Sequence, residues 1–250
     1  MEGIIAECGN HHFGELSKAK DLIRLAKACG ARYVKFQAID PEQFISGSMP
    51  REFYRQCDLH LSGYLELITE AYREGIEIFF SIFGPKYKEL RKELGKRPHK
   101  ISGGQFLSMP IKELEEWNFS GIQVVTSIPA AADEFLLERK PYVTNMHLMY
   151  VTPYQLSGNR DYSKQILHYA DLLEKPIGFS DHSPEISQTV KAIDTGCMLI
   201  EKHFNIYGQQ YFKGRIYRDS LHAASVKELA LICKHFQKVH NPCSAQSVAQ

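Results

Sequence analysis

Two polar clusters in this chain are spaced so that their side chains can do chemistry together. An apolar run ends in polar groups both at residues 178–183, Gly-Phe-Ser-Asp-His-Ser, and at residues 199–204, Leu-Ile-Glu-Lys-His-Phe. Such runs are typical of buried parallel strands, whose last side chains lie at one edge of the sheet. A helix predicted over residues 184–195 lets both strands run in one direction, which brings His182 and His203 together. The spacing therefore predicts a metal centre.

The two histidines favour a particular kind of metal. A structural zinc needs four protein ligands that close its coordination shell, whereas His182 and His203 supply two and leave coordination positions open. Asp181 and Glu201 stand beside them as ligands or as groups that orient the imidazoles. This set suits manganese, with magnesium or cobalt as alternatives, polarising a substrate oxygen while it keeps water ligands. The alternative is a pair of hydrogen-bonded structural histidines.

Other predicted strands also end in polar residues. Two lysines among hydroxyl groups would hold a phosphate or carboxylate, so a small anionic substrate is expected. A lysine buried in such a mouth needs an anionic partner, although Lys35 could instead be exposed on a strand edge. Glu7 could instead act as a helix cap. The full predicted set at the strand ends is Glu7, Lys35, Gln37, Ser81, Lys100, Ser102, Thr126, Ser127, Tyr150, Ser180, Asp181, His182, Glu201 and His203.

Alternating strands and helices are predicted to position these residues. Apolar runs predict strands over residues 3–7, 33–37, 77–81, 99–102, 122–127, 143–150, 177–180 and 198–203. Helical spacing predicts helices over residues 17–28, 53–74, 86–95, 111–117, 130–138, 162–173, 184–195 and 224–239. This order predicts a single-domain α/β protein, a (β/α)₈ TIM barrel over residues 1–240 with a polar tail at 241–250. A doubly wound open sheet is the alternative.

Composition excludes several classes of partner. A formal net charge of +1 with 24% charged residues gives no electrostatic signature for nucleic acid or an anionic membrane. No apolar run is long enough to cross a bilayer, and no basic-then-apolar leader precedes Ile4. The six cysteines lack the close pairing of a zinc knuckle or a disulfide framework. A cytoplasmic protein with reduced thiols is expected.

Three further motifs carry weaker signals. His11 and His12 are adjacent in the first loop and look like a pair of metal ligands. Neighbouring side chains rarely point in the same direction, which favours a loop or substrate-contact role instead. The turn at residues 102–104, Ser-Gly-Gly, could offer backbone N–H groups to a phosphate. Residues 152–154, Thr-Pro-Tyr, are interpreted as a turn after the sixth strand.

Taken in order, these motifs resemble the sialic acid synthase family of phosphoenolpyruvate-condensing barrels. The family's opening Ile-Ala-Glu-Ile-Gly is similar to residues 4–9, and its Val-Lys-Phe-Gln is identical to residues 34–37. The two histidine-bearing strand ends resemble the family's signature strand ends. The remaining matches are to Lys-Ile at residues 100–101 and to Tyr-Pro-Thr-Pro at residues 150–154. The resemblance runs from residue 4 to about residue 235.

The resemblance implies a phosphoenolpyruvate-dependent transferase that forms a C–C bond. It implies that His182 and His203 bind a divalent metal, usually manganese, which holds the aldehyde of an acceptor sugar, with Glu201 supporting this site. The product would be a nonulosonic or related 3-deoxy-2-keto sugar acid, made from an N-acetylmannosamine-like aldose with release of phosphate. It implies that phosphoenolpyruvate is held by Lys35, Ser81, Lys100, Thr126 and Ser180, and that the sugar or attacking water meets Glu7, Gln37 and Tyr150.

The chain also departs from the family pattern. Lys-Ile-Gly-Ser-Gly-Glu is Lys-Ile-Ser-Gly-Gly-Gln at residues 100–105, and Leu148 stands where the family has asparagine. The Gly-Pro-Asp acceptor motif is out of register, with Asp219 or Arg215 as candidates to replace it. We expect the C-terminal antifreeze-like domain to be missing, with a homodimer or a separate lid-domain partner in its place.

Two other classes of function stay open. A desolvated Lys35 or Lys100 could form a Schiff base in an aldolase or lyase of keto acids. A non-catalytic barrel that binds a sugar acid with a partner is the other alternative.

Overall fold

Parallel strands close into a barrel at the centre of the molecule. The computed structural model describes residues 1–42, 49–154 and 160–240, so the predicted tail at 241–250 lies outside the described residues. Within these ranges, consecutive strands pair in parallel and the last pairs with the first, which confirms the (β/α)₈ barrel and excludes the open sheet. The barrel strands are β1 Gly3–Gly9, β2 Tyr33–Ile39, β3 Glu77–Phe83, β4 His99–Ile101, β5 Val124–Ile128, β6 His147–Val151, β7 Ile177–Asp181 and β8 Leu199–His203.

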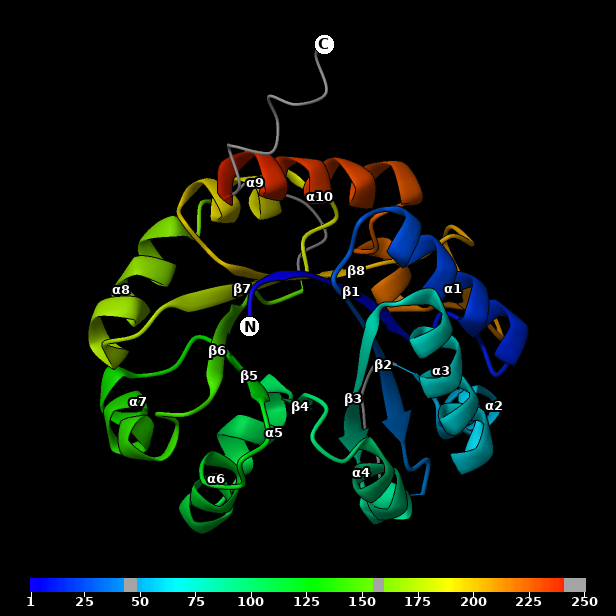
Figure 1. Ribbon diagram of the computed structural model, residues 1–250, viewed down its shortest axis with the longest axis horizontal. Helices are drawn as coiled ribbons and strands as arrows, with labels where there is room; N and C mark the ends of the chain where they lie inside the picture. The colour runs from blue at the N-terminus through cyan, green and yellow to red at the C-terminus, as the bar shows by residue number, and fades with distance from the viewer. Residues whose placement is uncertain (43–48, 155–159, 241–250) are drawn as a thin grey trace.

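Helices surround the strands as an outer ring (Figure 1). Apolar side chains of the helices pack on the outward faces of the strands and form the main core. Among the described residues, no helix has the length and apolar character needed to cross a membrane. The helices are α1 Leu16–Ala28, α2 Arg51–Cys57, α3 His60–Glu74, α4 Lys88–Leu94, α5 Gly103–Ser108, α6 Ile111–Asn118, α7 Asp133–Arg139, α8 Ser163–Leu173, α9 Ser187–Asp194 and α10 Val226–His240.

Local chemistry explains two differences from the predicted helices. The helix predicted over 53–74 is divided into α2 and α3, because Asp58 accepts a hydrogen bond from the backbone N–H of His60, whose φ is +54°. The short α5 follows β4 directly, where the sequence predicted only a glycine turn. Ser102 and Gln105 form a capping box that satisfies its first N–H groups.

The interior of the barrel is divided into an apolar floor and a polar mouth. Side chains alternate along each strand, so every second residue faces inward. The first inward layer consists of Ile5, Tyr33, Phe79, Val125, Met149 and Leu199. Two residues further along β1, β2, β3 and β8 the inward side chains are Glu7, Lys35, Ser81 and Glu201, and Gln37 follows Lys35 two residues later on β2. The charged groups therefore lie at the C-terminal ends of the strands, above a closed floor.

Strand register places the polar residues beside one another. Glu7 is opposite Lys35 on β2 and opposite His203 on β8. Ser180 on β7 is opposite Glu201 on β8. The strands approach closely at Gly178, where a Cβ atom would lie 2.5 Å from the Leu199 carbonyl oxygen, so this position requires glycine.

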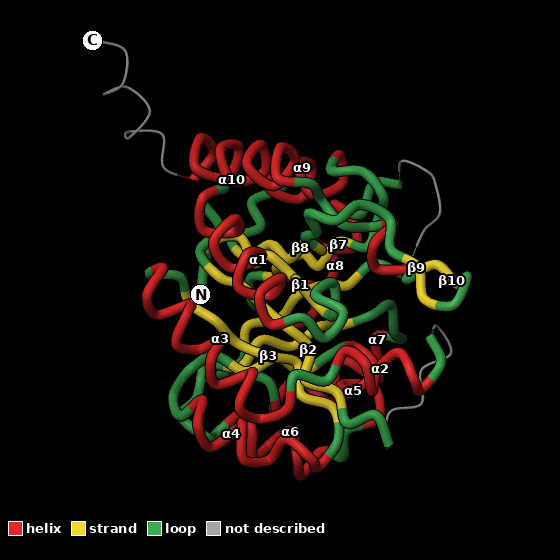
Figure 2. The backbone as a smooth tube through the Cα atoms, turned by 90° about the vertical axis from the view of Figure 1, so that its right-hand side faces the viewer, coloured by secondary structure: helices red, strands yellow, loops and turns green. Residues whose placement is uncertain are grey.

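A short hairpin follows β8. Its strands are β9 Tyr211–Phe212 and β10 Arg215–Ile216, and a 3₁₀ turn over Arg218–Leu221 returns the chain to the barrel. The hairpin lies at the end of the barrel opposite the N-terminus, beyond the C-terminal ends of the strands (Figure 2). Phe212 and Tyr217 pack with Ile39, Phe53 and Tyr54 in a separate apolar cluster at this rim. This segment therefore forms a wall of the mouth.

Candidate active site

Two lysines and two glutamates form a buried charge network at the mouth. Lys35 Nζ lies 2.5 Å from Glu7 Oε2 and 3.3 Å from Glu201 Oε2. Lys100 Nζ lies 3.1 Å from the same oxygen of Glu201. Ser81 Oγ accepts a hydrogen bond from Lys35 at 3.2 Å, and the Ser180 hydroxyl donates to Glu201 Oε1 at 2.9 Å. Glu201 thus holds both ammonium groups in one place.

The protonation states of this network differ from residue to residue. Burial raises the pKa of Glu7 to about 7, although Lys35 acts in the opposite direction. Burial acts on Glu201 as well, but Lys100 and Lys35 outweigh it and hold the pKa of this carboxyl below its ordinary value. For Lys35, burial is outweighed by Glu201 and Glu7, which raise the pKa of its amine. Of the two carboxyl groups, Glu7 is therefore the one that can exchange a proton near neutral pH.

Lys100 is the less well satisfied of the two lysines. Burial lowers the pKa of its amine to about 8, and Glu201 offsets only part of this effect. Its other contact is a weak one, with Met149 Sδ at 3.6 Å. A buried ammonium group with one carboxylate partner favours a further anion. An anionic ligand therefore gains the most binding free energy from a contact with Lys100.

His182 and His203 lie together in the same mouth, with ring centroids 5.1 Å apart. His182 Nδ1 lies 2.9 Å from the Thr152 carbonyl oxygen, which can only accept, so the proton is on Nδ1 and Nε2 has a free lone pair. His203 Nδ1 is buried without a hydrogen-bond partner in the described part of the chain. Burial lowers the pKa of both imidazoles, which keeps them in the neutral form that binds metals.

These features fit a divalent cation held by two imidazoles. Nowhere in residues 1–42, 49–154 and 160–240 do three or more His, Cys, Asp or Glu side chains converge as a ready-made metal site. A cation at the histidine pair would therefore keep open positions for water or for a substrate oxygen, as the sequence predicted. Which metal binds, and whether one binds, stays a prediction.

An aromatic wall, which the sequence did not predict, stands next to the histidines. Asp219 accepts hydrogen bonds from the hydroxyls of Tyr154 at 2.9 Å and Tyr217 at 2.7 Å. The Tyr154 ring stacks on His182 with centroids 4.5 Å apart and an interplanar angle of 13°. The sequence indicates Asp219 only as a candidate to replace a displaced motif, and it predicts a turn at Tyr154. No local pattern in the sequence indicates that Tyr217 returns to this site.

A cavity of roughly 440 Å³ joins the charge network, the histidines and the aromatic wall. Its volume is in the range of small-molecule sites. It brings together most of the predicted residues, namely Glu7, Lys35, Gln37, Ser81, Lys100, Ser102, Ser127, Ser180, His182, Glu201 and His203. It is also lined by Ile39, Tyr54 and Phe83, which the sequence did not single out, and by Gln105, where the sequence departs from the family pattern.

Three predicted substrate contacts lie elsewhere, and these predictions are corrected here. Thr126 and Tyr150 face outward into the core between strands and helices, where Thr126 contacts Met146 Sδ and Tyr150 packs on Tyr169. Their inward neighbours Ser127 and Val151 line the cavity instead. The reason is the two-residue period of a strand, because a shift of one position turns a side chain to the other face.

Asp181 is the third residue to be corrected, and it has a structural role. Its Oδ1 accepts from the backbone N–H and the hydroxyl of Ser183, while its Oδ2 accepts from Thr189 at 2.6 Å and from Lys202 Nζ at 3.1 Å. Both side chains of the Asp181–Lys202 ion pair are fully buried. The pair lies on the outer side of the barrel, so the carboxylate has no oxygen left for a substrate.

The weaker sequence signals are resolved as follows. His11 and His12 are buried and do not line the cavity; His11 Nδ1 contacts Gln210 Oε1 at 2.7 Å, and His12 Nδ1 accepts from the Gly14 N–H at 3.0 Å. The Ser102–Gly104 segment does line the cavity. Ser102 Oγ accepts from the Gln105 N–H at 3.3 Å, so this serine also caps α5.

Comparison with known proteins decides the family. The model of the NeuB family matches residues 22–246. The chain belongs to the NeuB family. N,N'-diacetyllegionaminic acid synthase from Campylobacter jejuni is 27% identical, with 94% of this chain and 76% of that protein covered. N-acetylneuraminate-9-phosphate synthase from Homo sapiens is 29% identical, with 90% and 67% covered.

The structure agrees with this assignment. Among solved structures, the N-acetylneuraminic acid (sialic acid) synthetase from Leptospira borgpetersenii superposes with a TM-score of 0.80 at 25% identity, covering 95% of this chain and 83% of that one. This NeuB family chain spans about two thirds of the length of several curated relatives, such as 64% of the Legionella pneumophila N,N'-diacetyllegionaminic acid synthase. The expectation of an enzyme of the sialic acid synthase family is confirmed.

Proposed function

We propose that this NeuB family barrel condenses phosphoenolpyruvate with an aldose, in a reaction that depends on a divalent metal. The products are a nonulosonic or related 3-deoxy-2-keto sugar acid and phosphate. One observation carries the proposal: Glu201 holds Lys35 and Lys100 in the same cavity as the neutral pair His182 and His203. An anion site and an electrophile site are therefore adjacent, as a condensation of two small molecules requires.

The lysine side of the cavity is suited to phosphoenolpyruvate. Lys35 and Lys100 supply charge for its phosphate and carboxylate, and the hydroxyls of Ser81, Ser127 and Ser180 supply directional donors. Because Lys100 has a single carboxylate partner among the described residues, an incoming phosphate relieves part of its burial cost. The same two charges stabilise the negative charge that develops on the departing phosphate.

The histidine side of the cavity is suited to the acceptor aldehyde. Manganese or another divalent cation bound by His182 and His203 would supply Lewis-acid polarisation of the aldehyde oxygen. The Thr152 carbonyl and the stacked Tyr154 ring fix the orientation of His182. Gln37 lines the same cavity, where its Nε2 donates to Glu7 Oε1 at 3.3 Å and its Oε1 accepts from Asn10.

The atoms of the overall reaction balance with one water. The methylene carbon of phosphoenolpyruvate forms a bond to the aldehyde carbon, whose oxygen gains a proton. Water adds to the cationic carbon that remains, and the C–O bond to phosphate breaks, leaving a keto acid and inorganic phosphate. Glu7 is suited to accept the proton of this water because its pKa is near 7 and Lys35 fixes its position.

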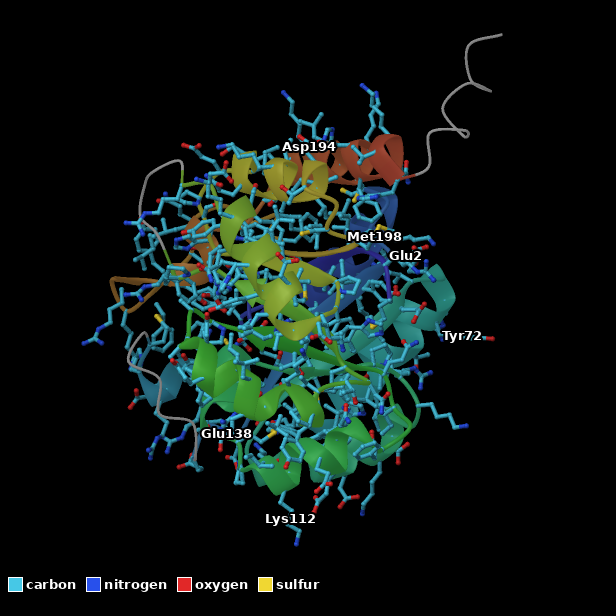
Figure 3. The ribbon with its side chains drawn as sticks, turned by 90° about the vertical axis from the view of Figure 1, so that its left-hand side faces the viewer. Glu2, Tyr72, Lys112, Glu138, Asp194 and Met198 are labelled. Carbon is cyan, nitrogen blue, oxygen red and sulfur yellow. The ribbon has the colours of Figure 1, made fainter. Side chains whose placement is uncertain are left out.

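The direct test is phosphate release from phosphoenolpyruvate with Mn²⁺ and a panel of N-acyl hexosamines. We expect turnover with at least one acceptor, and loss of turnover in Lys100→Met but not in Lys112→Met. Lys112 is a matched control because its side chain points into solvent on the outer face of α6 (Figure 3). A chain that binds neither Mn²⁺ nor phosphoenolpyruvate in calorimetry would be a non-catalytic barrel.

A Schiff-base aldolase is the second candidate, because the lowered pKa of Lys100 makes its amine more nucleophilic at neutral pH. Borohydride reduction in the presence of pyruvate distinguishes the two reactions. Covalent trapping on Lys100 without a metal requirement would favour the aldolase, whereas the condensation proposal expects no trapping.

We also propose that the reaction takes place in the cytoplasm. The cysteines Cys8, Cys29, Cys57, Cys197 and Cys233 are buried free thiols, which agrees with a reducing compartment. A homodimer or a partner chain that covers the mouth remains an expectation, to be tested by light scattering of the purified protein.

A further inference from the structure

The two cavity histidines differ in the hydrogen bonds that hold their rings. His182 Nδ1 donates to the Thr152 carbonyl oxygen at 2.9 Å, which fixes that ring. His203 Nδ1 is buried too, but it has no hydrogen-bond partner among the described residues. A ligand in the cavity therefore meets Nε2 of His203, because Nδ1 is closed off from it. His203 thus lacks the group that normally orients a metal-binding imidazole.

The ring of His11 is a direct neighbour of His203. The two ring centroids are 6.1 Å apart and the planes are at 87°, so one ring presents its edge to the other. His11 is fully buried and does not line the cavity, so a substrate does not meet it. Its Nε2 is buried without a hydrogen-bond partner in the described part of the chain. Each of these neighbouring imidazoles therefore has one unsatisfied buried nitrogen.

Gln210 determines which nitrogen of His11 carries the proton. The amide of Gln210 donates from Nε2 to the His11 carbonyl oxygen at 2.7 Å, and its Oε1 lies 2.7 Å from His11 Nδ1. An amide oxygen can only accept, so Nδ1 of His11 is the donor and carries the proton. In the neutral ring, Nε2 then has a lone pair and no proton. His11 Nε2 is therefore an unused buried acceptor.

A metal bound by His203 would create the matching donor. A neutral imidazole that gives the lone pair of Nε2 to a cation keeps its proton on Nδ1. In His203 that N–H is buried, and a buried donor without an acceptor is costly. The unpaired nitrogens of His203 and His11 are not in direct hydrogen-bond contact with each other, and a centroid separation of 6.1 Å leaves room for one bridging water.

We infer that His11 is a positioning residue for the metal ligand His203: it accepts the Nδ1–H of His203 through one bridging water, in the tautomer that Gln210 imposes. This inference rests on the proposed metal-dependent condensation and adds a residue from outside the cavity to its machinery. His182 is oriented by a backbone carbonyl and His203 by a side chain. Only the second of these can be removed by substitution, so the two ligands can be tested separately.

The test measures the affinity of the full chain for Mn²⁺ by electron paramagnetic resonance, without substrates. His11→Phe keeps a buried ring and removes the acceptor, so it should weaken Mn²⁺ binding by about 10- to 100-fold. His12→Phe is the matched control, because His12 is equally buried and its Nε2 is also unpartnered among the described residues, but its ring packs on Phe36. This control should bind Mn²⁺ within about twofold of wild type.

Two further measurements separate positioning from a merely structural role. His11→Gln keeps an acceptor oxygen and should bind Mn²⁺ at least about threefold more tightly than His11→Phe. Affinity for phosphoenolpyruvate in metal-free calorimetry should stay within about twofold of wild type in His11→Phe, because Lys35 and Lys100 do not contact this ring. A loss of both affinities together would indicate a distorted barrel and overturn the inference.

Gln210→Met provides a second route if His11→Phe does not fold. It removes the amide that fixes the tautomer, while the backbone contacts of Gln210 with Ser220 and Tyr217 remain. Mn²⁺ affinity should fall by about tenfold. Unchanged affinity in Gln210→Met would then overturn the inference.

The outcomes distinguish this inference from the proposed function. Equal Mn²⁺ affinity in wild type and His11→Phe, or an equal loss in His12→Phe, overturns the role of His11 and leaves the condensation intact. If Mn²⁺ binds but no acceptor turns over, the condensation fails and the affinity series still decides the role of His11. A wild-type chain that binds no Mn²⁺ overturns both the inference and the metal dependence of the proposed function.

Discussion

Lys100 Nζ lies 3.1 Å from Glu201 Oε2, yet burial still lowers the pKa of this lysine to about 8. One carboxylate shared between two lysines therefore leaves a cation that is only partly compensated. Burying such a cation costs free energy in the ligand-free protein, and an anionic ligand offsets that cost. This relationship makes the pH dependence of the site predictable.

The first prediction concerns the basic limb of the pH profile. A protonated Lys100 attracts phosphate, so kcat/KM for phosphoenolpyruvate should fall as the pH rises through about 8. In Lys100→Arg the guanidinium keeps its charge at high pH, so this limb should shift to higher pH. Initial rates from about pH 6 to about pH 10 provide the measurement. A wild-type profile that stays flat to about pH 9 contradicts the prediction.

The same lysine affects stability with a defined sign. The unfolded chain keeps the Lys100 proton up to an ordinary lysine pKa, whereas the folded chain loses it near pH 8. Between these values the unfolded state binds more protons, so the Lys100 contribution should stabilise the ligand-free protein as the pH rises. Bound phosphoenolpyruvate should raise this pKa again, which calorimetry detects as proton uptake near pH 8 in buffers of different ionisation enthalpy.

The second prediction concerns Glu7. If this carboxylate accepts a proton from the attacking water, kcat should fall as the pH drops below about 7, where Glu7 becomes protonated. Glu7→Gln should lower kcat by about 10²-fold and remove this acidic limb. Glu138→Gln is the matched control, because that side chain is exposed on α7 (Figure 3). Activity of Glu7→Gln within about threefold of wild type would exclude this role.

The third prediction concerns the metal. A chelator should abolish turnover and Mn²⁺ should restore it, because the aldehyde would lose its polarising group. Affinity for phosphoenolpyruvate should change far less, because Lys35 and Lys100 do not depend on the cation. His182→Ala should lose bound Mn²⁺ in elemental analysis, whereas His235→Ala should not, since His235 pairs with Asp194 at the surface. Full activity after chelation would refute the metal-dependent mechanism.

The fourth prediction concerns the structural role of Asp181. Asp181→Asn should lower the free energy of unfolding by about 3 kcal/mol, because it leaves the buried Lys202 ammonium without its charged partner. Asp194→Asn, at a surface ion pair with His235, should cost less than about 1 kcal/mol. Denaturant melts measure both values. A changed KM for phosphoenolpyruvate with unchanged stability would instead place Asp181 in the substrate site.

The fifth prediction tests which strand residues face the cavity. Thr126→Val and Tyr150→Phe change side chains that face outward, so both variants should keep KM within about twofold of wild type. Ser127→Ala removes a hydroxyl that lines the cavity and should raise KM for phosphoenolpyruvate by about tenfold. The opposite ranking would reverse the assignment of the two faces of β5 and β6.

The sequence determined the order of elements and the edge at which function lies. Apolar runs alternate with amphipathic helices along the chain, and parallel strands must deliver their last residues to one rim. Lys35, Lys100, Glu201 and His203 could therefore be assigned to one site before their distances were known. These features depend on residues that are close together in the chain, so they can be recognised in the sequence without the fold.

Tertiary structure decided which neighbour in each strand faces inward and which distant residues complete the site. Thr126 and Ser127 are equally polar in sequence, but only the closed barrel fixes which of them points to the cavity. Tyr217 and Asp219 reach the mouth because a hairpin beyond β8 returns there, and no local period encodes that return. Side-chain direction in a strand reverses with each residue, and long-range contacts depend on packing, so both emerge only from the folded chain.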